Sequence, residues 1–99
     1  MARYVILTRV SPESVKDPES LLDLERQVKE RVRTECPGVN WVGNYAVMGP
    51  YDYLDIFDAP DNDTAMRVST IIRSVGNSTT ELWPATEWTQ FRDNVLKTG

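Results

Sequence analysis

The order of hydrophobic patterns along the chain is the feature that most constrains its fold. Four stretches rich in β-branched, aromatic and aliphatic residues predict β-strands. They cover residues 3–9, 40–48, 53–59 and 78–87. Two further stretches, residues 18–35 and 61–75, place apolar side chains at spacings of three and four and predict helices. The elements therefore follow the order β-α-β-β-α-β.

Each predicted helix has a single apolar stripe, which indicates that it buries one face only. The stripes consist of Leu21, Leu24, Val28 and Val32 in the first helix, and of Ala65, Val68, Ile72 and Val75 in the second. The element order is that of the split βαβ, or ferredoxin-like, plan. Right-handed crossovers place both helices on one sheet face. We therefore predict an α+β fold with an antiparallel four-stranded sheet and two helices on one face.

The sheet face opposite the helices is expected to be apolar and to need a cover. Alternation along the strands assigns to this face Tyr4, Ile6, Thr8, Trp41, Tyr45, Val47, Tyr53, Asp55 and Phe57. Contiguous apolar patches beyond a few hundred Å² usually mark an interface. We expect a second copy to cover the face, which makes a dimeric α+β barrel and a homodimer or higher homo-oligomer.

Composition removes several classes of function. The 99 residues include no His and one Cys, which excludes His-dependent catalytic sets, His-ligated metals and an intrachain disulfide. Neither a metal nor a cofactor is predicted. The net charge of −4 disfavours nucleic-acid partners, and no apolar run has the ~20 residues of a membrane span. The apolar N-terminal stretch is too short for a signal peptide, so a cytoplasmic location is expected.

A chain of this length predicts one domain. We place it at residues 1–88, followed by a short amphipathic tail at 89–99. Trp88, Phe91 and Val95 fall at helical spacing across this boundary and predict a helical tail.

Short turn motifs add a family resemblance. The turn Gly49-Pro50-Tyr51-Asp52, then Ala59-Pro60-Asp61 and Gly76-Asn77, stand in an order that resembles the GYD-domain family over residues 3–87. The resemblance implies a ferredoxin-like, usually oligomeric domain of bacterial or archaeal origin and uncharacterised function. It carries over the motif positions Gly49, Tyr51 and Asp52, and no catalytic residue.

Five residues are candidates for ligand binding: Trp41, Tyr45, Tyr51, Asp52 and Asp55. Tyr and Asp can exchange protons, and the aromatic rings can stack on a ligand. Asp55 lies in mid-strand on a face expected to be covered, where burial raises the pKa of a carboxyl group. Each residue also has a structural interpretation. Tyr51 and Asp52 can be turn residues, Asp55 can reach water or an Arg, and the aromatic rings can form the core of an interface.

Three functions remain in competition. The first is an oligomeric small-molecule-binding or structural module without catalytic residues. The second is a cofactor-independent barrel enzyme, of monooxygenase or isomerase type, that uses Asp55 with Tyr45 or Tyr51. The third is RNA binding on the sheet, which the acidic balance and the lack of a basic Gly-Phe motif oppose. Whether any reaction is catalysed is left open.

Overall fold

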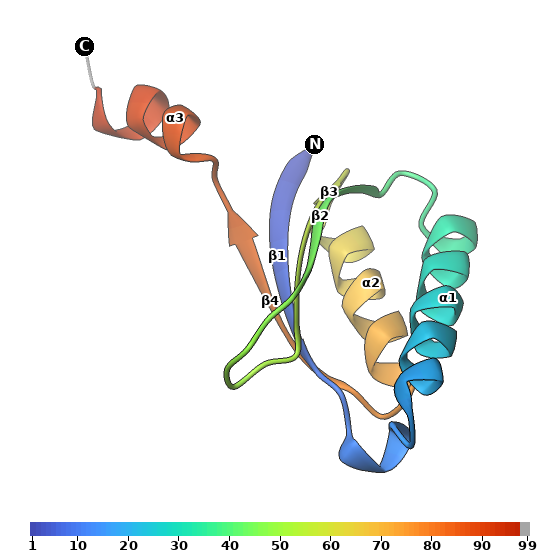
Figure 1. The fold of residues 1–99 in the computed structure, drawn as a ribbon. Coiled ribbons are helices and arrows are strands. Elements are labelled where there is room, and N and C mark those ends of the chain that lie inside the picture. Colours follow the sequence, from blue (N-terminus) through green and yellow to red (C-terminus); the bar gives the residue numbers. More distant parts are fainter. Residues whose placement is uncertain (98–99) are drawn as a thin grey trace.

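The computed structural model describes residues 1–97 and has the predicted order of strands and helices (Figure 1). The strands are β1 (Ala2–Arg9), β2 (Asn40–Ala46), β3 (Tyr53–Ala59) and β4 (Thr79–Ala85). The helices are α1 (Pro18–Glu35), α2 (Asn62–Ser74) and a short α3 (Trp88–Phe91), with a 3₁₀ turn η1 (Pro12–Ser14) and a π-helical turn η2 (Arg92–Leu96). The second and fourth strands end two residues earlier than the sequence predicts.

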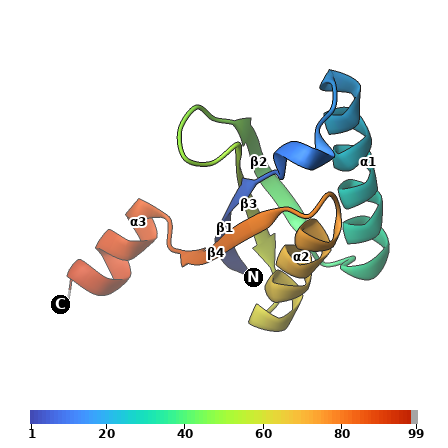
Figure 2. The same cartoon turned by 90° about the horizontal axis from the view of Figure 1, so that it is seen from below.

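The strands form one antiparallel sheet in the order β2-β3-β1-β4. Helices α1 and α2 lie side by side over one sheet face, and no helix of residues 1–97 covers the opposite face (Figures 1 and 2). The predicted α+β, ferredoxin-like arrangement is confirmed. Pro84 lies in β4 at the sheet edge, where the hydrogen bond it cannot donate is not needed.

The core lies between the sheet and the helices. It is built from β1 and β3 on one side and from the two helices on the other. Its buried members are Tyr4, Ile6, Phe57, Ala59, Val32, Cys36, Ala65, Val68, Ile71 and Ile72. The ring of Phe57 stacks on Tyr4 with centroids 5.6 Å apart and meets Trp41 edge-on at 5.6 Å.

The structure corrects the face assignment made from the sequence. Tyr4, Ile6 and Phe57 pack against the helices and do not lie on the open face. Thr8, Tyr53 and Asp55 share their side, since Thr8 pairs with Tyr53, and Ile6 with Asp55. The prediction was wrong because both faces of these strands are apolar, so alternation alone did not say which side the helices cover.

A β-bulge explains a second correction. Trp41 pairs with Phe57, but Gly43, two residues on, pairs with the next residue of β3, Ile56. The extra residue reverses the alternation of β2, so Trp41 faces the helices while Tyr45 lies on the open face. The open face therefore carries Val5, Leu7, Tyr45, Leu54, Ile56 and Trp83.

Each long helix begins at an aspartate that caps it. The Asp17 carboxylate accepts a hydrogen bond from Ser20 N at 2.9 Å, and the Asp61 carboxylate accepts one from Thr64 N at 2.7 Å. After α2, Gly76 and Asn77 adopt positive φ angles of 71° and 52°. This left-handed pair ends the helix and returns the chain to the sheet.

The C-terminal segment continues from β4 away from the rest of the molecule (Figures 1 and 2). It is helical from Trp88 to Leu96, and most of its side chains are exposed. The boundary at residues 88 and 89 stays a prediction, and residues 98–99 of the predicted tail lie outside the described residues. Within residues 1–97, no helix is long and apolar enough to cross a bilayer.

Candidate functional site

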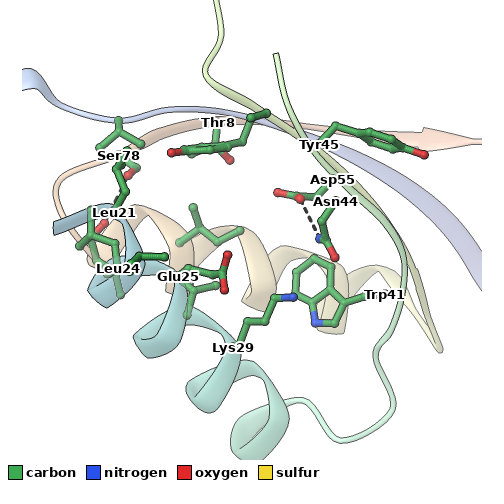
Figure 3. Close-up of a pocket in the computed structure, with 17 residues that line it drawn as sticks. Thr8, Leu21, Leu24, Glu25, Lys29, Trp41, Asn44, Tyr45, Asp55 and Ser78 are labelled. Carbon is green, nitrogen blue, oxygen red and sulfur yellow. Dashed lines mark hydrogen bonds between the residues drawn. The ribbon is translucent and has the colours of Figure 1, made fainter. Parts of the chain in front are cut away.

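A cavity of about 330 Å³ lies between the N-terminal half of α1 and the covered face of the sheet (Figure 3). Its volume is in the range of small-ligand sites, and most of its lining is apolar. The walls are formed by α1, β1, β2, β3 and the end of α2. The lining residues used below are Thr8, Glu25, Lys29, Trp41, Tyr53 and Asp55.

Helix α1 meets the core through Val32 and Val28, and its N-terminal half lies over the cavity. Of the predicted apolar stripe, Val32 is fully buried in the core. Leu21, Leu24 and Val28 are half-buried and line the cavity. These side chains face a hollow where the sequence pattern predicts core packing.

Trp41 supplies the aromatic wall of the cavity. Its ring packs against Phe57, and the Lys29 ammonium lies 5.9 Å from the ring centroid. A cation over an indole face is an attractive contact. Lys29 is thereby held beside the cavity from the α1 side (Figure 3).

Asp55 places a carboxylate in the cavity wall. Asn44 Nδ2 donates a hydrogen bond to its Oδ1 at 2.7 Å (Figure 3). Burial raises the pKa of Asp55, Glu25 raises it further, and the Asn44 hydrogen bond and the charge of Lys29 oppose the rise. Its second oxygen, Oδ2, has no hydrogen-bond donor among residues 1–97.

Thr8 is the second polar group on the sheet side. Its side chain is 4% exposed, and its Oγ1 has no hydrogen-bond partner within the described part of the chain. Buried hydroxyl groups are nearly always hydrogen-bonded, so such an atom calls for an explanation. Thr8 and Glu25 are not among the ligand-binding residues predicted from the sequence. Their presence at one cavity depends on how far α1 stands from the sheet, which no local pattern records.

The structure brings three of the five candidate residues to the cavity. Trp41 and Asp55 line it with their side chains. Tyr45 borders it, but its ring is 57% exposed and points away from the cavity in Figure 3.

Tyr51 and Asp52 lie elsewhere, in the loop between β2 and β3. Tyr51 donates a hydrogen bond to Glu81 on the open face, and its ring is 5.6 Å from the Arg9 guanidinium. Asp52 accepts from Val10 N at 2.8 Å and, through its own N–H, donates to the carbonyl of Thr8 at 2.9 Å. Both residues join the loop to β1 and its continuation, which is the structural reading of the turn motif.

A second hollow lies at the other end of the helices, beside Cys36 and between Glu35 and Arg67. Glu35 is held there by Arg31 and Arg67, each at 2.9 Å, which lowers its pKa. Burial raises the pKa of the Cys36 thiol. Within residues 1–97, no group of three or more acidic or Cys side chains is arranged to hold a metal ion.

Comparison with known families then places the chain. Residues 4–95 match the GYD domain. The chain belongs to the GYD-domain family. A relative from Thermus thermophilus, named glutamine synthetase and cystathionine beta-lyase binding protein, is 27% identical over 81 residues, which cover 78% of this chain and 80% of the relative.

Solved structures with the same fold come from regulators and from a plant. The leucine response regulatory protein of Mycobacterium tuberculosis has a TM-score of 0.56 at 14% identity over 87% of this chain. A second structure, described as a transcriptional regulator, has a TM-score of 0.57 at 12% identity over 88% of this chain. This chain spans about half (51%) of each regulator. A protein from Arabidopsis thaliana has a TM-score of 0.52 at 10% identity, covering 88% of this chain and 97% of its own.

Proposed function

We propose that this GYD-domain protein is a non-catalytic binding module that holds a small molecule between α1 and the sheet. The observation that carries the proposal is the cavity of about 330 Å³, which combines an apolar wall with a few inward polar groups. This combination is typical of ligand sites. The name of the Thermus thermophilus relative, which describes it as binding two enzymes, supports a binding role for the family.

A cavity-filling variant tests the proposal. Val28 lines the cavity from α1, so Val28→Trp places an indole in it, whereas Gln27→Trp adds the same indole on the exposed side of that helix. Small molecules screened by NMR should shift the amide resonances of the cavity in the wild type and in Gln27→Trp. Val28→Trp, once its fold is checked by circular dichroism, should lose those shifts. Binding that survives in Val28→Trp, or that maps outside the cavity, would contradict the proposal.

A second candidate function is a cofactor-independent enzyme that uses Asp55 as a general base. It is favoured by the rise in the pKa of Asp55, because a buried carboxylate is a stronger base than an exposed one. The two tyrosines proposed from the sequence point elsewhere, and Tyr53 is the tyrosine that lines the cavity beside Asp55. If a bound ligand is converted by the wild type and left intact by Asp55→Asn, this second function replaces the first.

We also propose that a second copy of the chain covers the open face of the sheet and completes a dimeric α+β barrel. The proposal is supported by the apolar side chains on that face, where Trp83 is 48% and Tyr45 57% exposed. Apolar surface left in water is costly, and a symmetric partner removes it on both copies. Tyr45 is common to this interface and to the face assigned from the sequence, whereas Tyr4, Ile6 and Phe57, assigned to the same face, pack against the helices.

A further inference from the structure

The polar groups that face the cavity are mainly hydrogen-bond acceptors. Asp55 projects a carboxylate from β3, and Glu25 projects one from α1 (Figure 3). Lys29 is the cation in the described lining, and its ammonium is placed over Trp41. The formal charge of these groups is therefore negative, with two carboxylates against one ammonium.

Two of these acceptors, Asp55 and Thr8, each have an oxygen atom without a hydrogen-bond donor in the described chain. Asn44 occupies only one oxygen of Asp55, and Oδ2 has no donor within residues 1–97. Thr8 Oγ1, in a side chain that is 4% exposed, also has no partner in the described chain. The Thr8 hydroxyl is buried and costs free energy when it is left unpaired, whereas Asp55 Oδ2 is not among the buried unpaired atoms and can be reached by solvent. Both residues can therefore accept a hydrogen bond from a ligand.

Strand register places these two residues together. Thr8 pairs with Tyr53, and Asp55 pairs with Ile6, so Thr8 and Asp55 are diagonal neighbours on the covered face of β1 and β3. Diagonal neighbours are about 7–8 Å apart. One ammonium group, which has three N–H donors, can lie between two such side chains and donate to both.

The raised pKa of Tyr53, which lines the same cavity, agrees with a negatively charged lining. The pKa of the Tyr53 phenol is raised first by burial and then by Asp52, Glu25 and Asp55. All three of these neighbours are acidic and disfavour a negative charge on the phenol, and two of them, Glu25 and Asp55, line the cavity.

We propose that the cavity selects small, mainly apolar molecules that carry a protonated amine, bound by Asp55 and Thr8. The inference rests on the proposed binding function and names its ligand class. The apolar body of the molecule packs on Leu24, Val28 and Trp41, which line the other walls. The carboxylates repel an anionic ligand of the same size.

Three probes of similar shape but different charge test whether the charge of the ligand determines its affinity. Titration calorimetry at low salt compares 2-phenylethylamine, 2-phenylethanol and 3-phenylpropionate, which carry a cation, a neutral hydroxyl and an anion. A hydrogen bond to a charged group contributes more than a neutral one, so we expect the amine to bind roughly tenfold or more tightly than the alcohol. The carboxylate should bind most weakly.

Substitutions test whether Asp55 and Thr8 are responsible for the preference for the amine. In Asp55→Asn, the amine and the alcohol should bind with affinities that differ by less than about threefold, because the charge that distinguishes them is gone. Asp23→Asn makes the same change of charge on the exposed side of α1, where Asp23 pairs with Arg26 at 3.3 Å, and should keep the wild-type preference. Thr8→Val should weaken binding of the amine.

The outcomes separate this inference from the proposed function. If the alcohol or the carboxylate binds in the cavity as tightly as the amine, the amine preference is wrong and the binding function stands. If Asp55→Asn keeps the full preference, the assignment to Asp55 is wrong. If none of the three probes shifts the NMR resonances of the cavity, the inference and the binding site proposed for molecules of this size both fail.

Discussion

Two threonines that are paired in the sheet differ in whether their hydroxyl groups have a hydrogen-bond partner. Thr8 of β1 and Thr80 of β4 are paired in register. The Thr80 hydroxyl shares a hydrogen bond of 2.8 Å with Ser69 of α2, whereas the Thr8 hydroxyl has no partner in the described chain. An identical side chain is therefore hydrogen-bonded in one strand and left without a partner in the next.

Replacing each threonine by valine should have opposite effects on stability. Thr8→Val removes an unpaired buried hydroxyl and should raise the free energy of unfolding by about 1 kcal/mol in the absence of ligand. Thr80→Val removes a hydrogen bond from Ser69 and should lower it by about 1 kcal/mol. Urea denaturation followed by circular dichroism measures both. A loss of stability in Thr8→Val would show that this hydroxyl is satisfied.

Asp55 should make the stability of the protein depend on pH. Burial raises its pKa in the folded state above the ordinary value of 3.8, so the folded protein holds this proton more tightly than the unfolded chain does. The cost of the buried charge is fully present above the folded-state pKa and disappears as pH falls toward 3.8. Asp55→Asn should therefore be more stable than the wild type at neutral pH.

The difference between the two proteins should shrink as pH falls from 7 to about 4.5. Urea denaturation at several pH values measures it, and Asp23→Asn is the control, since that carboxylate lies on the exposed side of α1. A difference that stays constant or grows at acid pH would contradict the assignment to Asp55.

The sequence could indicate some site residues and not others. Asp55 was identifiable because a carboxylate in mid-strand between Tyr53 and Phe57 conflicts with the apolar pattern around it. Thr8 could not be identified in this way, because threonine is common in strands and fits the pattern around it. Its importance comes from a missing hydrogen bond, which only the packing of the helices reveals.

At the scale of elements, the helices were predictable because several local preferences agree. Pro18 stands in the first turn of α1, Asp17 caps it, and one apolar stripe runs along it. The strands were predictable in position but not in orientation. The extra residue in the bulge at residues 41–43 turns Trp41 and Tyr45 to opposite faces. Gly43 is the sequence signal for this bulge, since a glycine inside a strand often marks one.

The cap of α2 gives a prediction at this scale. Asp61 accepts hydrogen bonds from Thr64, which lower its pKa. Asp61→Ala should lower the free energy of unfolding at neutral pH, whereas Asp61→Asn, which keeps an acceptor, should lower it less. The loss in Asp61→Ala should diminish below the ordinary pKa of 3.8, because protonation weakens the cap in the wild type. Thermal unfolding at pH 7 and at acid pH measures both effects.

At the scale of the whole molecule, helices cover one side of the sheet, and the β2–β3 loop lies over part of the other side. Tyr51 of this loop reaches Glu81 on β4, and Leu7, between them in the sheet, is only 7% exposed. Trp83 and Tyr45 remain about half exposed beyond it. The loop thus shields part of the open face and leaves the rest for the second copy that we propose.

Light scattering tests that arrangement. The wild type should have the mass of a dimer or a higher oligomer at micromolar concentration, because burial of the open face is worth about 25 cal/mol per Å² before association costs. Ile56→Asp places a charge in the middle of this face and should shift the protein to monomer. Met48→Asp, at a fully exposed loop position, should leave the mass unchanged. A wild type that stays monomeric would contradict the proposed dimer.

The cavity between α1 and the sheet is the centre of this account, and a crystal structure with 2-phenylethylamine tests it most directly. We predict electron density for the molecule between α1 and β3, with its nitrogen within hydrogen-bond distance of Asp55 Oδ2 and Thr8 Oγ1 and its ring against Trp41. Density for the amine only on the outer surface, with the cavity closed by the side chains of α1, would contradict the account.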